Sequence, residues 1–127
     1  MVVVVESLAL STALTQVMKS ASGRLAPLVY SSRATEGDLA SSDAARAFPS
    51  GYTAAAVSAP TSYSIAYWKR HPDSPWRIVV LVASETLALA TGVLTIPAGW
   101  HYPTDVAAGG LLGAAAGVLM PVPHSDW

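Results

Sequence analysis

"VAAGGLLGAAAGVLM", residues 106–120, decides the fold, because it sets glycines at positions 109, 113 and 117 within an apolar run. Residues four apart lie on one side of an α-helix. Small residues at such positions let a second helix approach closely, a pattern typical of helix contacts in lipid. Pro121 and Pro123 follow the run, and proline ends a helix. The stretch therefore predicts a helix that packs tightly against a neighbour.

Three other apolar segments, 2–18, 53–68 and 78–98, precede this helix in the sequence. Together the four segments predict an all-α, antiparallel bundle of about four apolar helices, which we interpret as transmembrane. A spanning helix needs about 20 apolar residues, and only 78–98 reaches this length unaided. The other segments need tilted helices or snorkelling flanks. The single charge within 78–98, Glu85, is costly in lipid and is expected to face the bundle. Its expected partner is a hydroxyl such as Ser84, Thr86 or Thr91 of a neighbour.

Composition narrows the class of protein. The chain of 127 residues is long enough for a single domain, 1–127, with a real core. Apolar residues make up 52% of it and charged residues 12%, about half the usual charged share. This favours a membrane bundle over the alternative, a soluble alanine-rich bundle. The net charge of −1 does not indicate the excess of basic residues that nucleic-acid binding needs. The absence of cysteine excludes disulfides and thiolate chemistry.

Most polar residues lie in the links between the apolar segments, so the positions of these links predict where polar side chains gather. The link 19–51 is mostly loop, with a short surface helix expected within 34–47, and the link 69–77 is short and basic. In an up-and-down bundle of four helices, 19–51 and the turn before 106 meet at the same end. That end would gather Lys19, Arg24, Ser50, Gly51, Tyr52, Thr95, His101 and Asp105.

Two short stretches at that end indicate chemistry. "FPSGYTAAA", residues 48–56, is a turn that feeds a helix, with Ser50 as a good N-cap and Gly51 permitting close approach of a ligand. The free N–H groups of a helix start suit an anion. "GWHYPTDVAAG" places His101 and Asp105 four apart at the next helix start, so their side chains can meet.

A carboxylate bonded to one ring nitrogen of His101 would fix the tautomer and leave the other nitrogen free as a nucleophile. The spacing alone fits an incidental polar pair equally well. Together with "KSASGRLAP", residues 19–27, the stretches in this order resemble the signature of the type-2 phosphatidic acid phosphatase superfamily, which includes the vanadium-dependent haloperoxidases. That signature is Lys, six residues, Arg-Pro; then Pro-Ser-Gly-His; then Ser-Arg, five residues, His, three residues, Asp.

The resemblance extends from Glu6 to Pro121. It implies that the chain is a shortened, C-terminal core of the family fold, with the loop 19–51 carrying the first two motifs. A homo-oligomer is one way to bury the faces that such a core leaves open.

The resemblance also implies roles for single residues. His101 matches the nucleophile that becomes a phospho-histidine, and Asp105 matches the residue that orients it. Lys19 matches the first-motif lysine, while Ser50 and Gly51 match the turn that holds the phosphoryl oxygens. Such a site uses no metal or other cofactor, and phosphate or vanadate would occupy it.

Three positions depart from the family pattern. Ala26 stands where an arginine is expected, Tyr52 stands where the acid histidine is expected, and Leu94 and Thr95 replace Ser-Arg. Losing one preorganised donor costs about 10²–10³ in rate, and losing a general acid costs about 10²–10⁴. Tyr52 is retained as a catalytic candidate, although a phenol, with a pKa of about 10, is a sluggish acid. Arg24 is expected to swing in toward the phosphate.

The resemblance thus implies an integral membrane protein that binds a phospholipid phosphate or an isoprenyl diphosphate. Its inherited reaction is phosphomonoester or diphosphate hydrolysis, impaired by the lost residues. The expected location is the bacterial inner membrane with the site facing the periplasm. The alternative function is a catalytically silent phosphate or lipid binder, or a structural membrane module.

Overall fold

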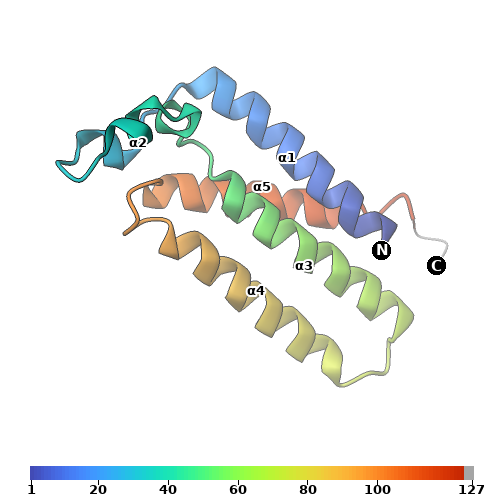
Figure 1. The fold of residues 1–127 in the computed structure, drawn as a ribbon. Coiled ribbons are helices and arrows are strands. Elements are labelled where there is room, and N and C mark those ends of the chain that lie inside the picture. Colours follow the sequence, from blue (N-terminus) through green and yellow to red (C-terminus); the bar gives the residue numbers. More distant parts are fainter. Residues whose placement is uncertain (125–127) are drawn as a thin grey trace.

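The computed structural model describes residues 1–124, and helices joined by turns and loops are the regular secondary structure of this range. As predicted, four long helices form an antiparallel bundle (Figure 1). They are α1 (Val2–Ser22), α3 (Gly51–Arg70), α4 (Trp76–Leu94) and α5 (Pro103–Leu119). The surface helix expected within 34–47 is α2 (Glu36–Ala40), with short 3-10 turns at Pro27–Tyr30 and Ser42–Ala45 on either side. The third apolar segment stops being helical at Leu94, ahead of Pro97 and of Gly99, whose φ is 84°.

The glycine face of α5 packs directly on α3, as the opening stretch predicts. A Cβ added to Gly109 would lie 2.3 Å from the carbonyl oxygen of Ser50, and one added to Gly113 would lie 2.3 Å from that of Ala54. Real Cβ atoms do not approach backbone this closely. The two helices can therefore sit at this distance only because α5 presents glycine.

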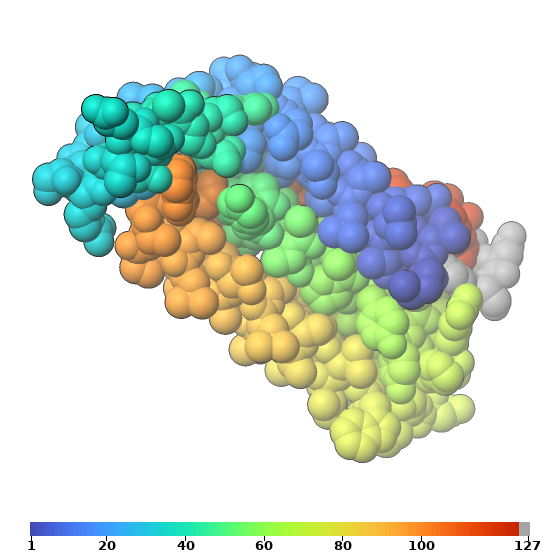
Figure 2. All heavy atoms as spheres, viewed as in Figure 1, coloured from blue at the N-terminus to red at the C-terminus, as the bar shows by residue number. Residues whose placement is uncertain are grey.

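The interior of the bundle is polar and small, while its surface is apolar. The buried residues of α1 recur every four positions: Val3, Ser7, Ser11, Thr15 and Lys19. Ser11 Oγ lies 3.1 Å from Ser58 Oγ of α3. Large apolar side chains are exposed instead, especially along α4, which forms one flank of the molecule in Figure 2 (Ile78, Val79, Val82, Leu87, Leu89, Val93 and Leu94). Small residues inside and large apolar residues outside suit helices packed within lipid.

Two helical stretches are long and apolar enough to cross a membrane, Val2–Tyr30 and Trp76–Leu94. The second was expected to reach this length; the first does so because α1 continues past the apolar segment 2–18 into the polar link. The charge inside α4, Glu85, accepts a hydrogen bond of 2.7 Å from the Thr61 hydroxyl of α3. Glu85 thus pairs with a hydroxyl, as expected, but the hydroxyl belongs to Thr61 of α3. The expected partners Ser84, Thr86 and Thr91 donate to backbone carbonyls of their own helix, α4.

The segment between α1 and α3 is fastened over one end of the bundle, where Figure 1 shows α2. The backbone N–H of Ala26 donates to Ala44 O at 2.8 Å, and that of Ala47 donates to Arg24 O at 2.9 Å. The N–H of Leu28 donates to Gly99 O at 2.8 Å, which ties the segment to the α4–α5 turn. This end therefore joins the four segments that carry the candidate site.

Candidate active site

A cavity of about 290 Å³ lies at this end of the bundle. Its lining comes from the end of α1, the 41–47 segment, the start of α3 and the α4–α5 turn: Lys19, Asp43, Arg46, Tyr52, Trp100 and His101. A second hollow of about 320 Å³ shares Lys19, Asp43 and Tyr52 with it and adds Gly51. Three residues singled out from the sequence, at 19, 52 and 101, thus line one cavity.

His101 is buried and held in one orientation. Its side chain is 4% exposed, and its Nδ1 lies 2.8 Å from the backbone carbonyl oxygen of Ala47. A carbonyl can only accept, so Nδ1–H is the donor and a neutral ring carries its lone pair on Nε2. Burial lowers the pKa of His101 below its ordinary value, and the Lys19 ammonium adds to this, while the Ala47 hydrogen bond and nearby carboxylates act against it. The ring is therefore a neutral nitrogen base suited to nucleophilic attack.

Asp105 reaches this histidine only at a distance. Its Oδ2 lies 3.9 Å from His101 Nδ1, beyond hydrogen-bond reach. The two side chains meet at ion-pair distance, as the spacing of four predicts, but the expected hydrogen bond is missing because both carboxylate oxygens are engaged elsewhere. Oδ2 accepts the backbone N–H of Tyr102 at 2.7 Å and closes the start of α5, and Oδ1 accepts Arg24 Nη1 at 2.7 Å. The orienting hydrogen bond of His101 comes from Ala47 instead.

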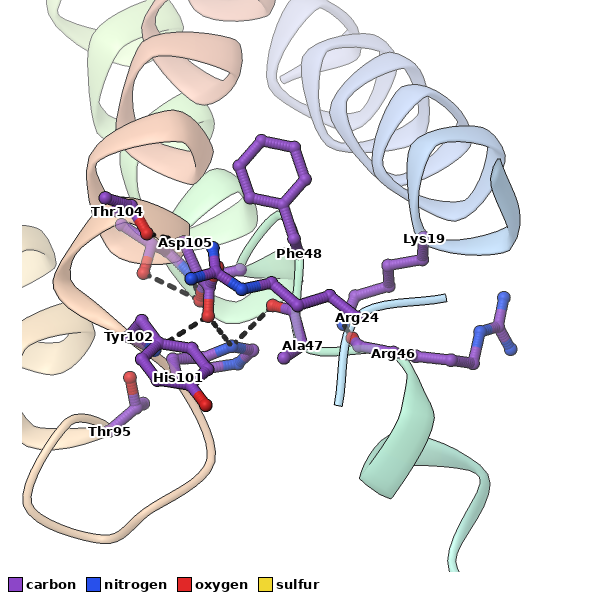
Figure 3. Close-up of polar contacts among 12 residues, drawn as sticks. Lys19, Arg24, Arg46, Ala47, Phe48, Thr95, His101, Tyr102, Thr104 and Asp105 are labelled. Atoms are coloured by element: carbon purple, nitrogen blue, oxygen red, sulfur yellow. Dashed lines mark hydrogen bonds and ion pairs between the residues drawn. The ribbon is translucent and has the colours of Figure 1, made fainter. Parts of the chain in front are cut away.

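Arg24 is placed against Asp105, away from the lining of the cavity. Its Nη1 also donates to Thr104 Oγ1 at 2.9 Å, and its guanidinium stacks 4.2 Å from the ring centre of Tyr102 (Figure 3). The Asp105 carboxylate is fully buried, and this guanidinium balances its charge. The swing toward phosphate expected from the sequence would break this pair.

The expected phosphate-binding residues other than Arg24 differ in whether they line a hollow: Lys19 and Gly51 do, and Ser50 does not. The Lys19 ammonium donates to the backbone carbonyl of Arg46, and its side chain lines both hollows. Gly51 borders the second hollow, and a Cβ there would touch Lys19 Cε at 3.5 Å. Ser50 is fully buried; its Oγ caps α3 by accepting the N–H of Thr53 at 3.3 Å. Ser50 therefore shapes the turn and does not line the cavity.

The three departures from the family signature also have clear positions. Tyr52 is 64% exposed and meets the His101 ring edge-on, with the ring centres 6.3 Å apart. Ala26 is fully buried beneath the 41–47 segment, so no space for an arginine remains at that position. The Thr95 hydroxyl donates to Gly92 O of α4 at 2.6 Å. Neither Ala26 nor Thr95, where the signature has an arginine, brings a charge to the cavity.

Sequence reasoning missed three contributors to the site. Asp43 and Arg46 line the cavity, and the carbonyl of Ala47 orients the histidine. The Arg46 guanidinium donates to Gln16 Oε1 at 2.8 Å and points away from His101 in Figure 3. Two charged residues just before "FPSG" were a readable signal. The Ala47 contact was not, because it is made by main chain, which no residue type marks.

The lowered pKa of His101 predicts a pH dependence. His101 lies in the turn between α4 and α5, outside both helices. Protonation of Nε2 removes the nucleophilic lone pair. Because burial lowers the pKa of His101 below its ordinary value of 6.5, this loss is delayed to more acidic pH, and the neutral ring is the majority form at pH 6.5. NMR titration of the labelled imidazole in micelles should give a midpoint below 6.5; a midpoint above it contradicts this account.

Comparison with known proteins adds one finding. A family model described as the PAP2 superfamily matches residues 1–126 of the chain. No match was found among curated proteins or solved structures.

Proposed function

Because this chain belongs to the PAP2 superfamily, we propose that it is a membrane phosphatase-like protein that binds the phosphate or diphosphate group of a lipid in the cavity beside His101. The reaction it inherits is hydrolysis of a phosphomonoester or diphosphate through a phospho-histidine. The same lipid-phosphate chemistry suits phosphatidate, phosphatidylglycerol phosphate and isoprenyl diphosphate.

The protonation pattern of His101 is the observation that carries this proposal. With Nδ1–H donated to Ala47 at 2.8 Å, the Nε2 lone pair of the ring is the free nucleophile. It attacks phosphorus, the bond from phosphorus to the leaving oxygen breaks, and that oxygen takes a proton. The Lys19 ammonium at the cavity wall stabilises the charge on the phosphoryl oxygens.

The proton for the leaving oxygen comes from Tyr52, whose ring lies edge-on to His101. A phenol holds its proton too strongly to be an efficient acid at neutral pH. The lost arginines at 26 and 95 leave the transition state with fewer donors. We therefore infer slow turnover, with binding of phosphate preserved better than catalysis.

A catalytically silent phosphate or lipid binder is the second candidate. It is favoured by the exposure of Tyr52 and by the engagement of Arg24 with Asp105, which together leave Lys19 and His101 as the main phosphate contacts. Both candidates share the same membrane setting. We propose the bacterial inner membrane, with the cavity on the periplasmic side and with a homo-oligomer burying part of the exposed apolar surface.

Hydrolysis of phosphatidate in detergent micelles tests the proposal. We expect slow release of phosphate that orthovanadate inhibits and that His101→Ala abolishes. His71→Ala is the matched control, because this exposed histidine lies just after α3 at the opposite end of the bundle. Release that is brisk and unaffected by His101→Ala would overturn the proposal. Phosphate binding without any release would select the silent binder.

A further inference from the structure

The second half of the proposed reaction needs a proton acceptor. Water that attacks a phospho-histidine must lose a proton as its oxygen bonds to phosphorus. His101 cannot serve, because its Nε2 carries the phosphoryl group and its Nδ1–H is committed to Ala47. The inference below rests on the proposed function and concerns which group takes this proton.

The other side chains of the cavity are poor acceptors, with one exception. An ammonium and a guanidinium have no lone pair to offer, and the indole of Trp100 is a donor only. Tyr52 gives up its proton in the first half of the reaction, and its side chain, 64% exposed, is open to water that can restore that proton. Among the described residues that line the cavity, the Asp43 carboxylate is left as the group with oxygen lone pairs that can accept a proton.

Asp43 also lies where such a base is needed. It lines both the cavity beside His101 and the adjoining hollow, so it stands at their junction. Asp43 and His101 line the same cavity, and the charge of Asp43 acts on both His101 and the Lys19 ammonium, so it lies near the nucleophile. The residue is exposed, so a proton it accepts can leave to solvent.

The segment that carries Asp43 is well anchored. Asp43 belongs to the 3-10 turn Ser42–Ala45. The N-cap of this turn is Ser41, whose hydroxyl oxygen accepts the backbone N–H of Asp43 at 3.2 Å. The next residues are tied down by the bond from Ala26 N–H to Ala44 O. The backbone that carries the Asp43 side chain is therefore held in place by hydrogen bonds.

We propose that Asp43 is the general base that deprotonates the water which hydrolyses phospho-His101. As a proton passes from water to the Asp43 carboxylate, the water oxygen bonds to phosphorus. The bond between phosphorus and Nε2 breaks, and its electron pair returns to the ring. Inorganic phosphate leaves, and Asp43 releases its proton to solvent. Tyr52 then serves the first half of the reaction and Asp43 the second.

The lifetime of the phospho-enzyme tests this division. The full chain in micelles is loaded with radiolabelled p-nitrophenyl phosphate, whose leaving group needs no acid, and then chased with unlabelled ester. Asp43→Asn should still label and should lose the label about 10²-fold more slowly. Asp43→Glu should decay nearly as fast as the unchanged chain. Glu36→Gln is the matched control, since this exposed acid lies in α2, outside the cavity lining.

The outcomes separate the two proposals. Label that forms and decays equally fast in the unchanged chain and in Asp43→Asn overturns the role of Asp43 and leaves the proposed function standing. Absence of label from the unchanged chain overturns both. Circular dichroism of each variant shows that the helical fold is retained, and decay of the Asp43→Glu label at the Asp43→Asn rate would also contradict the assignment.

Discussion

Replacing Tyr52 with histidine should raise hydrolysis of phosphatidate by about 10²-fold, the lower end of what a general acid contributes. Tyr52 lines the cavity, and its ring lies edge-on to His101 with the centres 6.3 Å apart. An imidazole there titrates near neutral pH, whereas a phenol does so near pH 10. Initial rates in micelles measure the gain.

Two comparisons make this prediction specific. The gain should be much smaller with p-nitrophenyl phosphate, because a good leaving group does not need protonation. Tyr52→Phe keeps the ring and removes the hydroxyl, so it should slow phosphatidate hydrolysis. Equal rates for tyrosine, phenylalanine and histidine at this position would show that it does not act on the leaving oxygen.

Restoring an arginine at position 26 should not add to this gain. Ala26 has no exposed surface, and its N–H is bonded to Ala44 O beneath the segment that also carries Asp43 and Arg46. A long side chain there would push this segment off the bundle end. The family signature and the local packing therefore disagree at this position, and packing decides.

The largest effect on stability is expected at Gly113. A Cβ at this position would lie 2.3 Å from the Ala54 carbonyl oxygen and 3.0 Å from its Cα, both backbone atoms of α3. Gly113→Ala should cost about 1–3 kcal/mol, the usual range for overpacking, and Gly113→Leu should prevent the bundle from assembling. Thermal loss of helical circular dichroism in micelles measures both.

Gly110 is the matched control on the same helix. A Cβ there would meet only Thr53 Cγ2, at 3.8 Å, an ordinary contact. Gly110→Ala should be neutral or stabilising, since alanine gains about 1 kcal/mol over glycine within a helix. Equal destabilisation by the two alanine substitutions would contradict the role given to the glycine face.

The bundle was readable from the sequence because its determinants are local and periodic. Glycines at 109, 113 and 117 and the apolar run 78–98 each specify a helix and one of its faces. The end of α4 was harder to predict, because Ile96 and Ala98 continue the apolar run past Leu94, and only Pro97 and Gly99 signal the turn.

The site was readable only as far as residue types mark it. Motif positions 19, 52 and 101 do line one cavity. The partners of His101 and Arg24 were not foreseeable, because they depend on how the loop folds over the bundle end. The main-chain carbonyl of Ala47 hydrogen-bonds to His101, and Arg24 forms an ion pair with the buried carboxylate of Asp105. Spacing shows which side chains can meet, and competition among hydrogen bonds decides which do.

The most direct test of the account is to identify the residue that becomes phosphorylated. The chain is incubated with radiolabelled phosphatidate, quenched in alkali, and digested to locate the label. We predict an acid-labile phosphoryl group on His101 that is absent from His101→Ala and retained in His71→Ala. A label on another residue, or hydrolysis that proceeds with no label on His101, would contradict the central claim that this histidine is the nucleophile.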